Sequence, residues 1–224
     1  SCKQRQVTDA LERIAKIPLP EISPILGSAE IWAYRNKMEY TFSNKCWLTR
    51  EQLASGEEFP DRDAAGFHIP GAFDKVLDIK ACCLQDSLGD RLRLFVKQYA
   101  KEHSLPFYDL RAQEGFVRTL MIRITSTGES MAVVSLGADM PEATRGLLDA
   151  MRAEFPELTS LMYVVNTKCN DTIADLDIKL HSGREYIEEE MEGLRFRIGP
   201  KSFYQTNSRQ AYELYKVARD FADL

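Results

Sequence analysis

The sequence predicts an α+β fold in which a mostly antiparallel sheet packs against a few helices. Strand-like segments come in pairs around polar turns, and such hairpins outnumber strand–helix–strand units. Amphipathic segments with helical spacing are separated by prolines and glycines. With 224 residues, of which 44% are hydrophobic, the chain is long enough for a packed core.

The first third of the chain predicts one helix followed by strands. Residues 3–17 form a helix because Val7, Leu11 and Ile14 recur on one face, and Pro18 and Pro20 end it. Residues 30–47 are rich in aromatic and β-branched side chains, which suit a strand. A polar loop with room for one helical turn follows at 51–63. Residues 66–69 and 76–79 are expected to pair as short strands.

The rest of the sequence, from residue 87 onward, predicts alternating hairpins and helices. A helix over 87–103 precedes strands at 117–125 and 131–136, which flank a turn containing Gly128. A third helix starts at Pro141 after an Asp139 cap and ends before Pro156. Strands are expected at 158–166 and 173–180, and a hairpin at 188–198. The last helix, 207–222, would turn its apolar residues inward, namely Ala211, Leu214, Tyr215, Ala218 and Phe221.

Composition excludes several classes of protein. No apolar run is long enough for a membrane span, and the first residues lack the apolar core of a signal peptide. Five scattered cysteines do not form a disulfide framework, so we expect free thiols in a reducing cytoplasm. The net charge is −5, yet residues 195–219 hold six basic residues against one acid, or +5. An anionic partner would therefore meet a patch, not the whole surface.

The densest chemical signal lies at residues 198–208. Gly199 and Pro200 break the preceding strand, and Thr206 or Asn207 can cap the following helix. Phe203 offers a stacking face, and the Gln205 amide both donates and accepts hydrogen bonds. The segment suits a base, a nucleotide or an adenosine-like cofactor. The alternative is an ordinary strand–helix junction with Phe203 in the core.

Several motifs occur in the order and spacing of one family. Residues 199–207 read GPKSFYQTN, preceded by GREYI at 183–187, GLRF at 193–196 and an Asn-rich turn at 166–172; earlier segments read YRNK at 34–37 and DIKAC at 78–82. Together they resemble the RNA uracil-5-methyltransferase family along essentially the whole chain. Those enzymes write 5-methyluridine into ribosomal or transfer RNA with S-adenosylmethionine.

The resemblance implies roles for individual residues. Gln205 matches a residue that contacts the cofactor and the target base region, and Phe203 matches an aromatic residue near the flipped uridine. Arg35 and Lys37 match basic positions of an RNA-facing strand. Cys82 matches the fourth ligand of an iron–sulfur cluster found in one branch. We also expect RNA phosphates to be contacted by the patch formed by Arg195, Arg197, Lys201 and Arg209.

Departures from the family pattern limit these implications. Only Cys2 precedes the first helix, and one thiolate cannot replace the missing cluster ligands, so no iron–sulfur cluster is expected and Cys82 is a vestigial position. The family's glycine-rich cofactor loop, catalytic cysteine and general base would all follow Leu224. We therefore expect three parts: a helix and linker at 1–28, a central RNA-recognition domain at 29–198, and the start of a Rossmann-like methyltransferase domain at 199–224.

We therefore expect a central substrate-recognition fragment of a cytoplasmic enzyme that acts on structured RNA, namely ribosomal RNA. The fragment is expected to be inactive by itself. No obligate protein partner and no membrane contact is expected. Two alternatives stay open: a stand-alone RNA-binding module without catalysis, and an α+β scaffold that binds proteins.

Overall fold

The computed structural model describes all residues from Ser1 to Leu224 and divides them into two compact units, Ser1–Ile31 and Trp32–Leu224. The first unit holds helix α1 (Cys2–Asp9), which continues as the π-helical turn η1 (Ala10–Ile14). The predicted helix is thus present. The face that carries Val7 and Ile14 is not buried, since these residues are 53% and 82% exposed.

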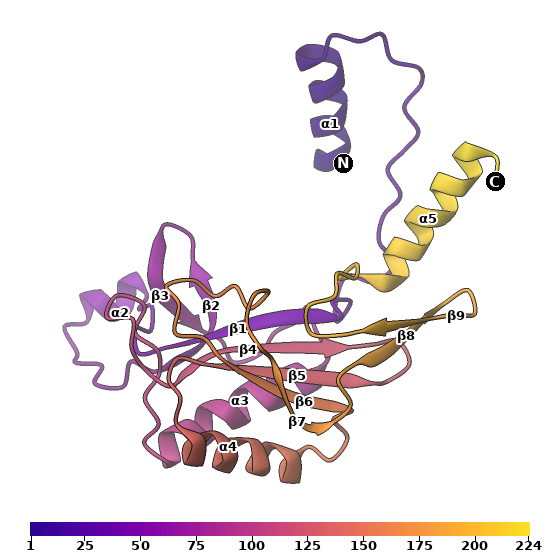
Figure 1. Cartoon of the computed structure of the whole chain (residues 1–224). Helices are drawn as coiled ribbons and strands as arrows, with labels where there is room; N and C mark the ends of the chain where they lie inside the picture. Colours follow the sequence, from indigo (N-terminus) through magenta and orange to yellow (C-terminus); the bar gives the residue numbers. More distant parts are fainter. The chain divides into compact units, whose positions relative to one another are not determined.

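A seven-stranded sheet forms the centre of the second unit, in the order β3-β2-β1-β4-β5-β6-β7 (Figure 1). All neighbouring strands are antiparallel except β5 and β6, which are parallel. This arrangement confirms the predicted α+β class with a mostly antiparallel sheet. The strands are β1 (Lys37–Ser43), β2 (Ala64–Ile69), β3 (Ala72–Asp78), β4 (Val117–Ile124), β5 (Ser130–Leu136), β6 (Ser160–Val165) and β7 (Lys179–Gly183).

Helices α3 (Ser87–Glu102) and α4 (Pro141–Glu154) cover one face of the sheet, as Figure 1 shows. Strand side chains alternate between the two faces. Leu120 and Ile122 of β4 therefore join the main core with Leu92 of α3 and Leu147 of α4. Helix α4 is also the crossover that allows β5 and β6 to run parallel.

The opposite face is covered by a hairpin and a loop. Met121 of β4 and Val133 of β5 pack in a second buried cluster with Ile187 and Ile198. The last two belong to the hairpin of β8 (Ile187–Met191) and β9 (Leu194–Ile198). Apolar side chains of the segment between β6 and β7, among them Ile173, pack against the same cluster. Both faces of the sheet are thus partly closed to water.

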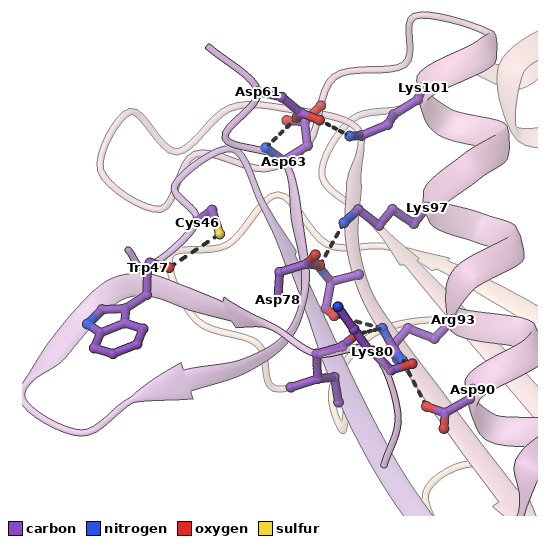
Figure 2. A network of polar contacts seen from close by, with 12 residues as sticks. Cys46, Trp47, Asp61, Asp63, Asp78, Lys80, Asp90, Arg93, Lys97 and Lys101 are labelled. Carbon is purple, nitrogen blue, oxygen red and sulfur yellow. Dashed lines mark hydrogen bonds and ion pairs between the residues drawn. The ribbon is translucent and has the colours of Figure 1, made fainter. Parts of the chain in front are cut away.

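Charged residues on α3 hold the β2–β3 edge in place (Figure 2). The fully buried Arg93 donates from Nη1 to the carbonyl oxygens of Ala65 (3.0 Å) and Ile79 (2.8 Å). One turn further, Lys97 pairs with Asp78 at 2.7 Å. The guanidinium also pairs with Asp90 on its own helix, and Lys101 pairs with Asp61. Backbone carbonyls that would otherwise lack partners are thereby satisfied.

Two predicted strands differ from the structure. The strand expected at 30–47 is limited to Lys37–Ser43, because Ala33 has a positive φ of 50° and Arg35 N donates to the Leu84 carbonyl instead of a strand. The strand expected at 173–180 begins only at Lys179, since Leu176 N turns back to the Ile173 carbonyl at 3.2 Å. The apolar residues there cover the sheet from outside it.

Short helix α2 (Arg50–Ala54), capped by Thr49, is the helical turn for which the polar segment at 51–63 had room. Other helical details differ from the prediction. The N-cap residue of α4 is Met140, which makes no side-chain capping hydrogen bond, so the prediction of an Asp139 cap is wrong. In α5 (Ser208–Ala222) only Ala211 is buried, whereas Phe221, predicted to point inward, is 81% exposed. No helix combines the length and hydropathy needed to cross a bilayer.

Candidate functional site

The segment between β9 and α5 forms a compact turn that presents alternate side chains to solvent. Gly199 N donates to Ser202 Oγ at 3.0 Å, and Ser202 N donates back to the Gly199 carbonyl at 3.2 Å. Tyr204 packs inward against Phe196 and the second cluster. Phe203 is 85% exposed, so the alternative that placed it in the core is wrong. Asn207 caps α5 by accepting from Gln210 N at 3.1 Å.

Hydrogen bonds to Asn36 join this turn to the start of β1. The Asn36 backbone N–H donates to the Thr206 carbonyl, and Asn36 Nδ2 donates to the Gln205 carbonyl, both at 2.8 Å. The Asn36 carbonyl in turn accepts from Ile124 N of β4 at 2.9 Å. The Gln205 side chain is left exposed beside the strand that carries Lys37. Residues far apart in the sequence therefore share one surface.

A groove of about 500 Å³ lies next to this turn on the sheet face opposite the long helices. Its floor is made by β1, β4 and β5, with Met121 and Val133 at the centre. One wall is the loop 171–174, and the other is the turn 200–203, which contributes Lys201 and Phe203. Its volume lies within the ~300–1,000 Å³ of typical small-molecule sites.

A buried arginine on the strand beneath positions the first wall. Arg118, 1% exposed, donates from Nε to Asp171 at 2.8 Å and from Nη1 to the carbonyls of Asn166 and Lys168, each at 2.7 Å. Its guanidinium also lies over the Tyr108 ring, 4.3 Å from the centroid. The buried Asn166 closes the turn, since its Nδ2 donates to the Asn170 carbonyl at 2.9 Å. Nothing in the sequence marked Arg118 as the residue that holds this Asn-rich turn.

The basic residues around the groove differ in whether an acidic group already neutralises their charge. Lys37 pairs with Glu39 at 2.6 Å, and Lys201 Nζ donates to the Leu176 carbonyl at 2.6 Å. Arg123 lies in the floor and is 4% exposed. Burial lowers the pKa of Arg123, against the weaker opposing charge of Glu39. A guanidinium nevertheless stays protonated in proteins, so a cation lies in the floor.

The structure brings together most residues that the sequence predicted for RNA contact. Phe203 and Lys201 line the groove with Lys37, and Arg35 Nε donates to the Lys37 carbonyl at 3.4 Å. Gln205 is two residues further along the same turn.

The basic residues of β9 are already engaged within their hairpin. Arg195 and Arg197 lie 3.8 Å and 3.5 Å from carboxylate oxygens of Glu188, and the Arg197 guanidinium lies over the Tyr186 ring. Glu189 of the same hairpin is buried: it is 1% exposed and accepts from the backbone N–H of Ser126 at 3.1 Å. RNA phosphates would therefore compete with existing partners on this hairpin.

The cysteine residues do not form a metal site. All five are free, and no group of three or more His, Cys, Asp or Glu side chains is arranged to hold a metal ion. Cys82 is half-buried, and its backbone N–H donates to Asp90 at 2.8 Å. Because an iron–sulfur cluster needs several converging thiolates, the residues present do not fit one.

Several bacterial proteins are similar to this chain over nearly all of its length. The chain is 57% identical to an "uncharacterized RNA methyltransferase" of Porphyromonas gingivalis over 99% of its length and 49% of the relative's. A protein of the same description from Bacteroides thetaiotaomicron is 56% identical over 99% of this chain and 50% of that protein. An uncharacterized RNA methyltransferase from Chlorobaculum tepidum is 34% identical over 95% of this chain and 45% of that protein. The chain thus spans about half the length of these relatives. No protein-family model matches it.

Among solved structures, the fold is similar to that of the Pyrococcus abyssi tRNA (uracil-54, C5)-methyltransferase in complex with S-adenosyl-L-homocysteine. The TM-score is 0.63 at 21% identity, over 86% of this chain and 42% of that one. The sequence relatives extend over the same motifs that carry the resemblance noted above. The chain is thus similar, over nearly its whole length, to bacterial proteins described as RNA methyltransferases, and its fold is that of part of a tRNA (uracil-54, C5)-methyltransferase, in agreement with the resemblance of its motifs.

Proposed function

We propose that this chain is the RNA-recognition part of an S-adenosylmethionine-dependent RNA uridine C5-methyltransferase that modifies ribosomal RNA in the cytoplasm. The observation that carries the proposal is the exposed Phe203 on a turn held rigidly against β1, with Lys37 and Lys201 beside it. An aromatic face flanked by cations suits an unstacked base and its phosphates. The names of the relatives and the cofactor product bound to the archaeal enzyme support the same activity.

The chain's own residues would bind and orient the substrate. Phe203 stacks on a base that has left the RNA helix, which spares that base contact with water. The Gln205 amide donates to and accepts from polar edges near it. Lys37, Lys201 and Arg35 neutralise neighbouring phosphates. S-adenosylmethionine, when bound, supplies the methyl group, and Gln205 is the residue of this chain that we propose to contact it.

Methyl transfer needs groups that the groove does not contain. C5 of uracil is a weak nucleophile, and a thiolate that adds to C6 activates it. None of the groove-lining residues is a cysteine. We therefore propose that the 224-residue chain binds RNA without methylating it. Incubating it with labelled S-adenosylmethionine and unmodified ribosomal RNA should give no 5-methyluridine, and a labelled product would overturn this part of the proposal.

RNA binding itself is tested by titrating the chain with labelled ribosomal RNA hairpins and, in parallel, with transfer RNA. We expect tighter binding to ribosomal RNA, and affinity that falls steeply between low and physiological salt, because released counterions drive binding to phosphates. Preference for transfer RNA would overturn the ribosomal assignment. Binding to neither RNA would overturn the proposal and favour a scaffold that binds proteins.

A further inference from the structure

A buried cation without an acidic partner lies in the groove floor. Arg123 is 4% exposed; its Nη2 donates to the Ser202 carbonyl at 2.6 Å, and its Nε has no hydrogen-bond partner. The other two buried arginines, Arg93 and Arg118, each pair with an aspartate. Buried charges are normally paired, because removing an ion from water is costly. Arg123 forms no ion pair, and Glu39, whose charge acts on it, is held by Lys37 at 2.6 Å. The groove floor therefore offers Arg123 as a cation to an anionic ligand.

A second unpartnered polar group lies toward the other end of the same floor. Ser135 is 3% exposed, and its Oγ has no hydrogen-bond partner. It pairs across the sheet with Thr119, four residues from Arg123 along β4. At the strand rise of ~3.3 Å per residue, the two polar ends lie roughly 13 Å apart. Between them the floor is apolar, formed by Met121 and Val133.

The charged residues around the groove limit the net negative charge of a ligand that can bind there. Glu39 is paired with Lys37, and Asp171 is paired with Arg118. At the end near residues 200–203, Arg123 and Lys201 form no ion pair and donate instead to the backbone carbonyls of Ser202 and Leu176, with Glu39 and Asp175 as more distant acidic neighbours. Two cations suit a single phosphodiester, whereas Glu39 and Asp171 at the sides disfavour a more highly charged ligand.

We propose that this groove binds one unstacked nucleotide of the RNA substrate, separate from the base that stacks on Phe203. Its phosphate accepts from Arg123 Nε and Lys201, its base lies over Met121 and Val133, and a polar edge of the base meets Ser135 Oγ. A length of ~13 Å with one cationic end, an apolar middle and one hydroxyl end matches a nucleotide better than a free phosphate. The inference rests on the proposed function, since RNA is the assumed source of the nucleotide.

Two variants test the two ends of the groove. Arg123→Met should weaken RNA binding about tenfold to a hundredfold, the range for a charge-assisted hydrogen bond in a buried setting. It should also flatten the salt dependence by about 0.7 in the slope for single-stranded RNA. Ser135→Ala should weaken binding several-fold and leave the salt slope unchanged. Arg91→Gln, an exposed arginine on α3 outside the groove, is the matched control and should change neither quantity.

Thermal melting separates this role from a structural one. An unpaired buried charge is unfavourable in the free protein, so Arg123→Met should leave the melting temperature unchanged or raise it. A large fall would show that Arg123 serves the fold. NMR titration of the wild-type chain with uridine monophosphate should shift the signals of Arg123 Nε–H and the Ser135 amide. Uridine should shift only the Ser135 amide, and inorganic phosphate only Arg123.

The outcomes distinguish this inference from the proposed function. If RNA binds the wild-type chain and both variants equally, the groove is not a nucleotide site, yet the chain remains an RNA-binding protein. If phosphate alone reproduces all the shifts of uridine monophosphate, the site is an anion site and the nucleotide assignment is wrong. If no RNA binds the wild-type chain, the proposed function itself fails.

Discussion

Truncating Phe203 to alanine should reduce RNA affinity strongly and stability very little. The side chain is 85% exposed, so only about a sixth of the ~2–3 kcal/mol expected for full burial of a phenylalanine is at stake in folding, or about 0.4 kcal/mol. Stacking of a base on an aromatic ring contributes ~1–3 kcal/mol to binding, which corresponds to a loss of roughly five- to a hundredfold in affinity.

Urea denaturation and fluorescence anisotropy with a labelled ribosomal RNA hairpin measure the two quantities. Phe73→Ala is the matched control, because Phe73 is also an exposed aromatic residue (64%) but lies on the β2–β3 hairpin outside the groove. Phe203→Tyr, which keeps the stacking face, should retain most of the affinity. Equal affinities for Phe203→Ala, Phe73→Ala and the wild-type chain would refute the stacking role. A stability loss of several kcal/mol would refute the exposed placement of Phe203.

Three further predictions concern stability. Arg93→Ala should destabilise the fold by about 3–5 kcal/mol in urea denaturation, because it leaves buried carbonyls unpaired; an effect below 1 kcal/mol would contradict this. Burial acts to raise the pKa of Asp109, but hydrogen bonds from Lys45 and the backbone amides of Ala112 and Arg111 outweigh it and lower the pKa to about 2, from 3.8. A carboxyl pKa lower in the folded state stabilises above the unfolded value, so Asp109→Asn should cost about 1–2 kcal/mol at pH 7, and the difference should vanish between pH 4 and 2; a pH-independent difference would contradict the ion pair. Gly183→Ala should lower the melting temperature by several degrees, since φ is +83° and the added Cβ would lie 2.1 Å from the Thr159 carbonyl; an unchanged melting curve would argue against this backbone.

Local signals in the sequence were sufficient for most elements of the fold. The helices at 87–102 and 141–154 and the hairpin at 117–136 were predicted because apolar spacing and turn residues all lie within a few positions. Strand β1 began later than predicted, since its start depends on hydrogen bonds to residues 83–84 and 206 that no local pattern contains. The burial of Glu189 likewise depends on Ser126, 63 residues away.

The candidate site was predictable only where its residues are consecutive. The turn at 199–207 carries a dense motif, so Phe203 and Gln205 could be singled out. Arg118, Arg123 and Ser135 could not, because one polar residue in a strand has no spacing that distinguishes a buried site from a solvated face. Their importance appears when β1, β4 and β5 pair and the loop 171–174 closes over them.

The attachment of position 205 through its carbonyl has a practical consequence for redesign. Asn36 Nδ2 donates to the main-chain carbonyl of Gln205 and not to its side-chain amide. Side chains other than proline can therefore be exchanged at 205 while the hydrogen bonds from Asn36 to the backbone of 205 and 206 are kept. A library of variants at position 205 would therefore compare side chains on the same backbone. Differences in binding among the variants would report recognition of the ligand and not misfolding.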